Sequence, residues 1–448
     1  MNLMFEARNL IKSRLRNGPA FRRRLAEFTA SADLRGEALR EWQFRHLKET
    51  VTRAYEGTAY YRRAFDAAGF HPSSLRSLDD VARIPVTEKS AVRTCGPEFL
   101  STRHRGLKFS AQTSGSTGTP LQLSRDLDSI NAENAFLWRF WRAHGKQPGS
   151  RRATVRADLI TDVSGDKLWV YNRFNQELLA SAFHLNDQSM GQIVDRLRDF
   201  GAFDLYAYPS TAFVLADYVR RSGKELGFGA VFTSSEQLFP HQKELIEQQF
   251  HTRVHDWYGQ AERVGAIAHC AHGNYHIQED YSYVELEPVG NGEYELIGTS
   301  FFNHLFPLIR YRTGDRITLS DHACACGSPG RVVASIGGRT SCYIETPDGR
   351  KVSLVNHIPR GVPHLVEAQF VQESANGLCI RIVCEERFSD ADAGMLIQRA
   401  RERISPAMEY RIEKLAAIPR TSAGKFVPVI PLAQAGQPAT HPPDRVEA

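Results

Sequence analysis

Several features of membrane and secreted proteins are missing from this sequence. No run of 18 or more apolar residues occurs, so we expect no transmembrane segment. The N-terminal residues 1–8 lack the apolar core of a signal peptide, which favours a cytoplasmic protein. Cysteine is scarce, with seven residues among 448. In the cytoplasm, clustered cysteines are better interpreted as metal ligands than as disulfides.

Strong charge of either sign is also missing. The net charge is +5, and the hydrophobic and charged fractions of 42% and 24% are typical of a globular protein. Six basic residues do gather near the N-terminus: Lys12, Arg14, Arg16, Arg22, Arg23 and Arg24. Because Phe21 is the only aromatic residue among them, we interpret this run as the solvated face of a helix and expect no nucleic-acid partner. Contact with an anionic membrane surface stays open as an alternative.

The pattern of apolar residues predicts an α/β protein with a smaller α+β domain at its C-terminus. We expect a helical part over residues 1–100, an α/β core over 101–338, a small domain over 339–432 and a disordered tail over 433–448. From about 150 to 335, short apolar runs alternate with helical patterns, which predicts largely parallel strands. Helices are predicted at 126–142, 211–221, 240–250 and 390–404.

The most informative stretch is residues 110–120, rich in glycine and hydroxyl side chains and closed by Pro120. Apolar residues flank it, which predicts a loop between two short strands. Glycines let backbone N–H groups converge on an anion, so the loop suits phosphate. It lacks the order of a Walker A loop. The composition alone would equally suit a flexible linker.

The order of residues in this loop resembles the phosphate loop of the adenylate-forming enzymes, which include acyl-CoA synthetases and luciferases. Five further stretches resemble that superfamily, in the same order along the chain: residues 233–236, 256–262, 311–315, 338–339 and 419–425. The helical N-terminal part and residues 275–280 and 346–350 are similar to the phenylacetate–CoA ligase group and its capsule-biosynthesis, CapK-like branch. The resemblance covers residues 38 to 430.

The resemblance implies a large multi-layer N-terminal adenylation domain and a small mobile C-terminal domain. It implies catalytic roles for Lys425 and for Glu262, which would also hold Mg²⁺. The nucleotide would be held by Thr113, Ser114, Gly115, Ser116, Thr117, Gly118, Ser235, Glu236, Tyr258, Gly259, Asp315 and Arg339. The chain departs from the superfamily at Ala261, at Ser341 and in the absence of a lysine beside Pro120.

The implied activity is ATP-dependent conversion of a small carboxylic acid to an acyl-adenylate, followed by transfer of the acyl group to coenzyme A. Two alternatives stay open at this point. The acceptor could be an amine, a hydroxyl or a carrier protein, or the chain could bind nucleotide without catalysis. By analogy with the superfamily, the acid would lie among Trp169, Phe174, Tyr206, Tyr208 and the residues from Ser234 onward.

Two short cysteine and histidine pairs predict a structural zinc site. Cys270 and His272 follow one motif, and Cys324 and Cys326 follow another. Three thiolates and one imidazole form a common tetrahedral zinc set with no open position. Alternative ligands are His269, His276 and His322, and the cysteines could also be thiols without a metal.

Overall fold

The computed structural model describes residues 3–113, 121–156, 167–185, 187–339, 343–352, 358–359, 361–421 and 424–432. The chain forms two compact units, each described here by itself. Unit 1 comprises Met1–Thr113, Pro120–Pro148 and His255–Gly337. Unit 2 comprises Ser114–Thr119, Gly149–Val254 and Gly338–Ala448.

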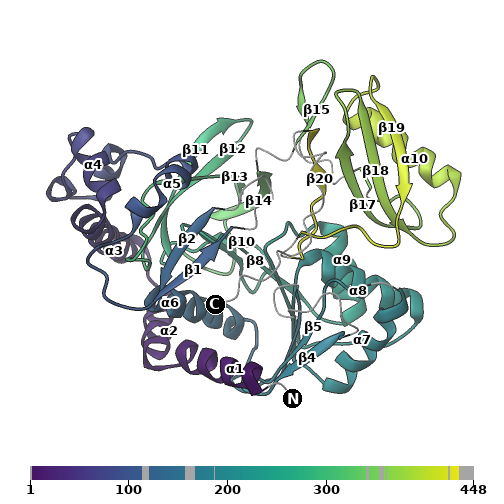
Figure 1. Cartoon of the computed structure of the whole chain (residues 1–448), viewed down its shortest axis with the longest axis horizontal. Coiled ribbons are helices and arrows are strands. Elements are labelled where there is room, and N and C mark those ends of the chain that lie inside the picture. The colour runs from purple at the N-terminus through teal and green to yellow at the C-terminus, as the bar shows by residue number, and fades with distance from the viewer. Residues whose placement is uncertain are drawn as a thin grey trace. The chain divides into compact units, whose positions relative to one another are not determined.

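Unit 1 begins with helices, as the N-terminal pattern predicts (Figure 1). They are α1 (Leu3–Arg16), α2 (Pro19–Ser31), α3 (Gly36–Gly57), α4 (Ala59–Ala67) and α5 (Lys89–Thr94), with short 3₁₀ helices at Pro72–Ser74, Leu78–Arg83 and Gly96–Phe99. Helix α6 (Leu127–Ala143) starts where predicted because the Asp126 carboxylate accepts a hydrogen bond from the Ser129 amide at 2.6 Å. The basic run lies on α1 and α2, and Arg24 pairs with Asp128 of α6, which ties α2 to α6.

The sheet of unit 1 is antiparallel rather than parallel. Its strands are β8 (Val254–Gly259), β9 (Ala266–His269), β10 (Tyr275–Ile277), β11 (Ser282–Gly290), β12 (Glu293–Ser300), β13 (Tyr311–Leu319) and β14 (Val332–Arg339), in the order β11-β12-β13-β14-β10-β9-β8. The pairs β8–β9, β9–β10, β10–β14, β11–β12 and β12–β13 all run antiparallel. The prediction of parallel strands was therefore wrong for this segment. Tight turns join its strands, as at Asn291 and Gly292, which both have positive φ.

Unit 2 contains the predicted parallel strands. They are β3 (Arg152–Val155), β4 (Trp169–Asn172), β5 (Glu177–Ala180), β6 (Asp204–Ala207) and β7 (Ala230–Ser234), in the order β7-β6-β3-β5-β4 with only β4 antiparallel. Helices α7 (Asp187–Phe200), α8 (Pro209–Ser222) and α9 (Pro240–Phe250) connect or follow them. Helices α8 and α9 lie close to the predicted limits, whereas α7 was not predicted. Side chains of these strands and helices share one buried core that includes Leu205, Val231, Ile193 and Phe250.

The C-terminal part of unit 2 is a small α+β domain. Its four-stranded sheet has the order β19-β18-β17-β20, from β17 (Leu365–Gln372), β18 (Gly377–Cys384), β19 (Glu409–Lys414) and β20 (Val429–Ile430). Helix α10 (Asp390–Arg403) covers one face of it (Figure 1), with Leu396 packed in the same core as Ile380. A hairpin of β15 (Ile344–Glu345) and β16 (Lys351–Val352) precedes the sheet.

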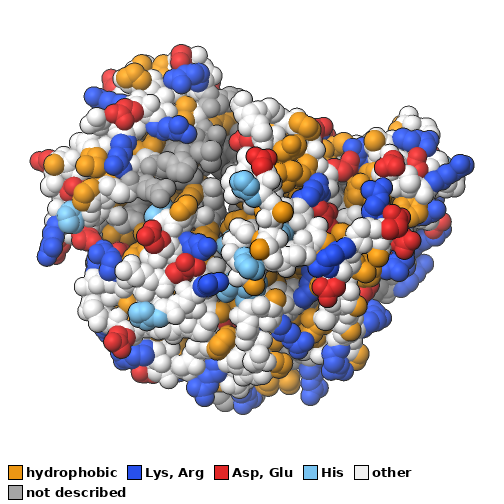
Figure 2. Space-filling view, turned by 180° about the vertical axis from the view of Figure 1, so that it is seen from behind, with side chains coloured by type: hydrophobic (Ala, Val, Ile, Leu, Met, Phe, Trp, Pro, Cys, Tyr) orange, Lys and Arg blue, Asp and Glu red, His pale blue; other side chains and the backbone are white. Residues whose placement is uncertain are grey.

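The surface is mixed in charge. Figure 2 shows Lys and Arg side chains interspersed with Asp and Glu over one face of the molecule. Within the described ranges, no helix combines the length and the apolar character that a membrane span requires.

The contact between the N-terminal helices and the antiparallel sheet depends on Tyr61, which is 1% exposed. Its hydroxyl accepts a hydrogen bond from the Ile309 amide at 2.8 Å and lies 3.2 Å from the Thr87 hydroxyl. Thr87 in turn donates to the Ile309 carbonyl at 2.7 Å. The Tyr61 hydroxyl thus satisfies a backbone group that has no access to water.

We predict that Tyr61→Phe loosens this contact, because it leaves the Ile309 amide buried without an acceptor. The expected loss of local stability is about 1–3 kcal/mol. Hydrogen–deuterium exchange should show faster exchange of the Ile309 amide, together with a lower midpoint of thermal unfolding. Tyr55→Phe is the matched control, since the Tyr55 hydroxyl donates to Asp66 at the surface. If both substitutions changed the exchange rate and the unfolding midpoint equally, the hydrogen bond from the Ile309 amide to Tyr61 would not be what stabilises this contact.

Candidate functional site

The predicted phosphate loop is carried by a two-stranded hairpin in unit 1. Strands β1 (Lys108–Gln112) and β2 (Gln122–Asp126) pair antiparallel with Gln112 opposite Gln122. Thr113 is buried, and its hydroxyl accepts a hydrogen bond from the Leu121 amide at 2.9 Å. The Thr113 side chain therefore closes the neck of the loop. Ser114, Gly115, Ser116, Thr117 and Gly118 lie outside the described residues.

Two motifs of unit 1 are joined by reciprocal hydrogen bonds between tyrosines and carboxylates. The Tyr258 hydroxyl, from the first motif, donates to Asp315 of the second at 2.7 Å. The Tyr311 hydroxyl, from the second motif, donates to Glu262 of the first at 3.2 Å. Residues 256–262 and 311–315 thus form one structural element, although about fifty residues separate them in the sequence.

Asp315 is held in a fixed orientation by its own strand. It is 7% exposed, and its backbone amide donates to the Thr313 hydroxyl at 3.0 Å. The Thr313 hydroxyl donates to the Leu296 carbonyl at 2.7 Å. Gly314 between them has a φ of 76°, which a residue with a side chain rarely adopts. This turn directs the Asp315 carboxylate toward Tyr258, where it could accept hydrogen bonds from a ligand.

Glu262 is the buried carboxylate that fits a cation. It is 5% exposed, and Tyr311 donates to its Oε1 atom. Its Oε2 atom is buried and has no hydrogen-bond partner among the residues that the structure describes. A buried carboxylate oxygen of this kind is costly unless a ligand or an ion completes it.

Backbone contacts hold the segment between Tyr258 and Glu262 in place. Arg125 of β2 donates to the Ala261 carbonyl at 2.7 Å, and burial beside Arg263 lowers the pKa of Arg125 to about 10. Arg263 donates to the Ser129 carbonyl at 2.7 Å. Arg125 has no signature in the sequence, because its contact is with a backbone carbonyl far along the chain. Gly259 ends β8 within this segment.

In unit 2, Glu236 connects two segments that carry predicted site residues. Its carboxylate accepts hydrogen bonds from the Ser210 amide at 3.1 Å and from the Phe426 amide at 2.6 Å. Ser210 lies in the first turn of α8, so Glu236 caps that helix. Burial raises the pKa of Glu236, while Arg420 and the two hydrogen bonds act in the opposite direction.

Lys425 lies beside Phe426 in a tight turn. The Thr421 hydroxyl accepts a hydrogen bond from the Lys425 amide at 3.1 Å, and the Thr421 amide donates to the Lys425 carbonyl at 3.0 Å. Arg420 anchors the turn, because it donates to both carboxylate oxygens of Glu367 at 2.7 and 2.9 Å. Arg339 ends β14, and its side chain lies outside the described part. Ser341, where the chain departs from the superfamily motif, also lies outside the described residues.

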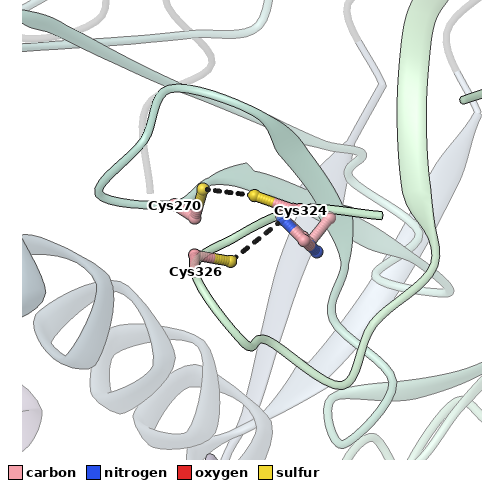
Figure 3. Close-up of side chains that lie close together, drawn as sticks. Cys270, Cys324 and Cys326 are labelled. Atoms are coloured by element: carbon pink, nitrogen blue, oxygen red, sulfur yellow. Dashed lines mark hydrogen bonds between the residues drawn. The ribbon is translucent and has the colours of Figure 1, made fainter. Parts of the chain in front are cut away.

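Three of the four predicted metal ligands come together in unit 1. Cys270, Cys324 and Cys326 point toward one another (Figure 3), and the Cys270 and Cys324 sulfur atoms are 3.7 Å apart. The fourth member is His276, whose Nε2 atom lies 3.4 Å from the Cys326 sulfur. One ligand atom from each of these four residues lies within 4.8 Å of all the others.

The structure therefore corrects the predicted histidine. His272 is exposed on the turn between β9 and β10, whereas His276 is 1% exposed and lies in β10. The Gly330 carbonyl accepts a hydrogen bond from Nδ1 of His276 at 2.9 Å, which leaves Nε2 facing the cysteines. Gly330 has to be glycine, because a Cβ atom there would lie 2.0 Å from the Ile277 carbonyl oxygen.

Hydrogen bonds to sulfur also suit thiolate ligands. Asn274 donates to the Cys324 sulfur at 3.1 Å, and the Ser328 amide donates to the Cys326 sulfur at 3.3 Å. The backbone amide of Cys326, followed by Asn274, lowers the pKa of Cys324 to about 6, whereas burial raises the pKa of Cys326 to about 11. The four side chains form one cluster of ligand atoms that could hold a metal ion.

Arg156, which follows β3 in unit 2, was not among the predicted site residues. Its guanidinium lies over the rings of Tyr206 and Tyr208, two residues that were expected to line an acid pocket. Trp169 begins β4 opposite Ala180, at the carboxyl end of β5. Phe174 is at the other end of these strands, in the turn between β4 and β5, so it does not share an edge with the two tyrosines.

Comparisons with known proteins agree with the motifs. Residues 344–431 match the CapK C-terminal domain. The protein CapK of Staphylococcus aureus is 24% identical over 361 residues, which cover 78% of this chain and 80% of CapK. A phenylacetate-coenzyme A ligase of Thermus thermophilus is 25% identical over 451 aligned residues, covering 88% of this chain and 97% of the ligase.

A solved structure has the same fold as this chain over most of its length. The crystal structure of a 2-hydroxyisobutyryl-CoA ligase in the postadenylation state, in complex with R3-HIB-AMP, superposes with a TM-score of 0.71. It is 19% identical in sequence and covers 90% of this chain, which in turn covers 91% of it. The chain thus shares the fold of that ligase over most of its length, and it is similar in sequence to CapK and to the phenylacetate-coenzyme A ligase.

Proposed function

We propose that this chain joins a carboxylic acid to coenzyme A in two steps. In the first step an oxygen of the acid attacks the α-phosphorus of ATP, and the bond to pyrophosphate breaks. In the second step the thiol of coenzyme A takes the acyl group, and AMP leaves. The observation that carries the proposal is the pair of tyrosine–carboxylate hydrogen bonds, which presents Asp315 and Glu262 together in unit 1.

The residues have separate roles in this proposal. Asp315 accepts hydrogen bonds from the ribose hydroxyls, and Tyr258 orients that carboxylate while its ring flanks the adenine. The loop from Ser114 to Gly118 holds the phosphates. Lys425 offsets the negative charge that develops during adenylation. Glu236 positions the turn that carries Lys425, since it accepts the hydrogen bond of the next amide along the chain.

Glu262 fits a magnesium ion, because its Oε2 atom is buried with no hydrogen-bond partner in the described part of the chain. Bound Mg²⁺ would neutralise charge on the phosphates of ATP. The chain's contribution is to hold the carboxylate still through Tyr311 and to keep its backbone fixed through Arg125 and Arg263. The proposal keeps the cytoplasmic location expected from the sequence.

Coenzyme A is the proposed acceptor, and an amine is the alternative that an assay can separate from it. The native chain would be given ATP, an acid, and either coenzyme A or hydroxylamine at equal concentration. Product that forms with coenzyme A at a much higher rate supports the thiol acceptor. Equal rates would favour an enzyme that releases the adenylate to another nucleophile.

We predict that Lys425→Ala slows acid-dependent pyrophosphate release by about 10²–10³-fold, the usual cost of removing one group that stabilises developing charge. Transfer of the acyl group from a chemically prepared acyl-adenylate to coenzyme A should change little, because the lysine acts in the first step. Lys414→Ala is the control, as an exposed lysine of the same domain. If both half-reactions fell together, the lysine would not have the proposed role.

We predict that Asp315→Asn weakens ATP binding by about tenfold or more, because a charge-assisted acceptor for the ribose is lost. Tyr258→Phe should weaken it less, by about fivefold, through loss of one hydrogen bond. Calorimetric titration with ATP, 2′-deoxy-ATP and 3′-deoxy-ATP tests whether the lost affinity comes from the ribose hydroxyls. Native protein should prefer ATP, and Asp315→Asn should lose that preference. A preference that survives in Asp315→Asn would place the ribose elsewhere.

We also propose that Cys270, His276, Cys324 and Cys326 bind a structural zinc ion. Four ligand atoms within 4.8 Å of one another, with no fifth position, suit tetrahedral zinc. The ion would link the turn after β9 to the loop after β13, which are otherwise joined here by the contacts of sulfur atoms.

We predict that His276→Ala removes the metal and that His272→Ala does not. Purified native chain should contain about one zinc per molecule by plasma mass spectrometry. The His276→Ala protein should contain far less and should unfold at a lower temperature, since ligand-bound zinc stabilises the folded form. If His272→Ala removes the zinc and His276→Ala does not, His272 is the ligand, as predicted from the sequence, and the proposed role of His276 is wrong.

A further inference from the structure

Gln260 follows Gly259, where β8 ends, and it was not among the predicted site residues. Side chains two residues apart along a strand lie on the same side, which places Gln260 beside Tyr258. The Gln260 side-chain nitrogen, Nε2, donates a hydrogen bond to the Tyr258 hydroxyl at 3.2 Å. The proposed nucleotide site therefore has a third member in addition to Tyr258 and Asp315.

The Tyr258 hydroxyl both accepts and donates. A phenol has a single O–H hydrogen, together with lone pairs that accept. Tyr258 donates that hydrogen to Asp315 at 2.7 Å, and its oxygen accepts from Gln260. Hydrogen bonds in such a chain polarise one another, because accepting a hydrogen bond makes the O–H group a stronger donor. Gln260 thus favours the direction of the hydrogen that holds the Asp315 carboxylate.

The Gln260 side chain is confined by its surroundings. A Cβ atom on Gly265 would lie 3.2 Å from the Leu296 Cδ2 atom and 3.6 Å from Gln260 Nε2. Leu296 is fully buried, and its carbonyl accepts from Thr313, whose hydroxyl also accepts from the Asp315 amide. The Gln260 amide therefore packs close to the strands that orient Asp315.

The oxygen of the Gln260 amide, Oε1, is buried and has no hydrogen-bond partner within the described ranges. A glutamine that ties parts of the scaffold together uses both ends of its amide. Gln278 does so, since it donates to the His276 carbonyl at 3.1 Å and accepts from Arg139 at 3.3 Å. Reversing the Gln260 amide would place its oxygen against Tyr258, where it would compete with Asp315 for the single hydrogen. The observed orientation serves Tyr258 at the cost of an unpaired oxygen.

We propose that Gln260 is a positioning residue for the ribose of the nucleotide, acting through Tyr258 on Asp315. This inference rests on the proposed function and adds a residue to its ribose site. Gln260 acts by setting the direction of the Tyr258 hydrogen rather than by contact with the ribose. Its removal should therefore matter only while Tyr258 has a hydroxyl. An acceptor in its place should be worse than an apolar side chain.

The test is a double-mutant cycle on ATP affinity, measured by calorimetric titration. The variants are Gln260→Met, Tyr258→Phe and the two together, with Gln260→Glu as the variant that replaces the donor by an acceptor. Gln248→Met and Gln248→Glu, at an exposed position of α9, are the matched controls. Each protein is titrated with ATP, 2′-deoxy-ATP and 3′-deoxy-ATP. The midpoint of thermal unfolding shows which variants are folded.

We expect Gln260→Met to weaken ATP binding by about threefold and to lower the preference for ATP over the deoxy analogues, because one neutral hydrogen bond is lost. In the Tyr258→Phe background the same change should have no further effect. Gln260→Glu should weaken binding by about tenfold or more, because the new carboxylate accepts the Tyr258 hydrogen and adds negative charge beside Asp315. The Gln248 variants should bind as the native chain does.

An effect of Gln260→Met that is equal with and without the Tyr258 hydroxyl would overturn the inference, because the glutamine would then act on its own. So would an equal loss of affinity for ATP and both deoxy analogues, since the ribose would not be involved.

The same experiment separates this inference from the proposed function. A ribose preference that depends on Gln260, without acid-dependent pyrophosphate release, supports the inference and contradicts the ligase activity. Pyrophosphate release together with a ribose preference that Gln260→Met leaves unchanged supports the ligase and overturns the inference. A native chain that binds none of the three nucleotides contradicts both.

Discussion

The proposed nucleotide site of unit 1 depends on two hydrogen bonds that cross between distant motifs. Tyr258 holds Asp315, and Tyr311 holds Glu262, so each motif supplies the tyrosine that fixes the other's carboxylate. Both carboxylates are nearly buried, and a buried carboxylate without such a donor would be costly. Tyr258 lies in β8, and Tyr311 and Asp315 lie in β13, so the hydrogen bond between Tyr258 and Asp315 connects strands that are not neighbours in the sheet.

In unit 2, the carboxylate of Glu236 joins two segments that are far apart in the sequence. Glu236 caps α8 through Ser210 and holds the Phe426 amide, so the turn with Lys425 is attached to the helix that follows β6. Because burial raises the pKa of Glu236, its charge depends on the hydrogen bonds and on Arg420 nearby.

Much of the fold could be read from the sequence where the signal is local. Helix α9 begins and ends where predicted, since Pro240 and Phe250 mark a short apolar period, and α6 starts after its cap Asp126. The antiparallel sheet was missed because strands of similar length look alike in either direction, although the turn at Asn291 and Gly292 did carry a signal for a hairpin. His272 was preferred to His276 on spacing alone. The turn after β9 leaves the His272 ring exposed, whereas the His276 ring in β10 reaches the cysteines.

Arg156 illustrates the limit of motif reading most clearly. A single arginine after a short buried strand has no signature, and its meaning comes from Tyr206, Tyr208, Ser234 and Ser235 on two other strands. The motifs of unit 1 are those that any enzyme of this chemistry needs for ATP, so they say little about the acid.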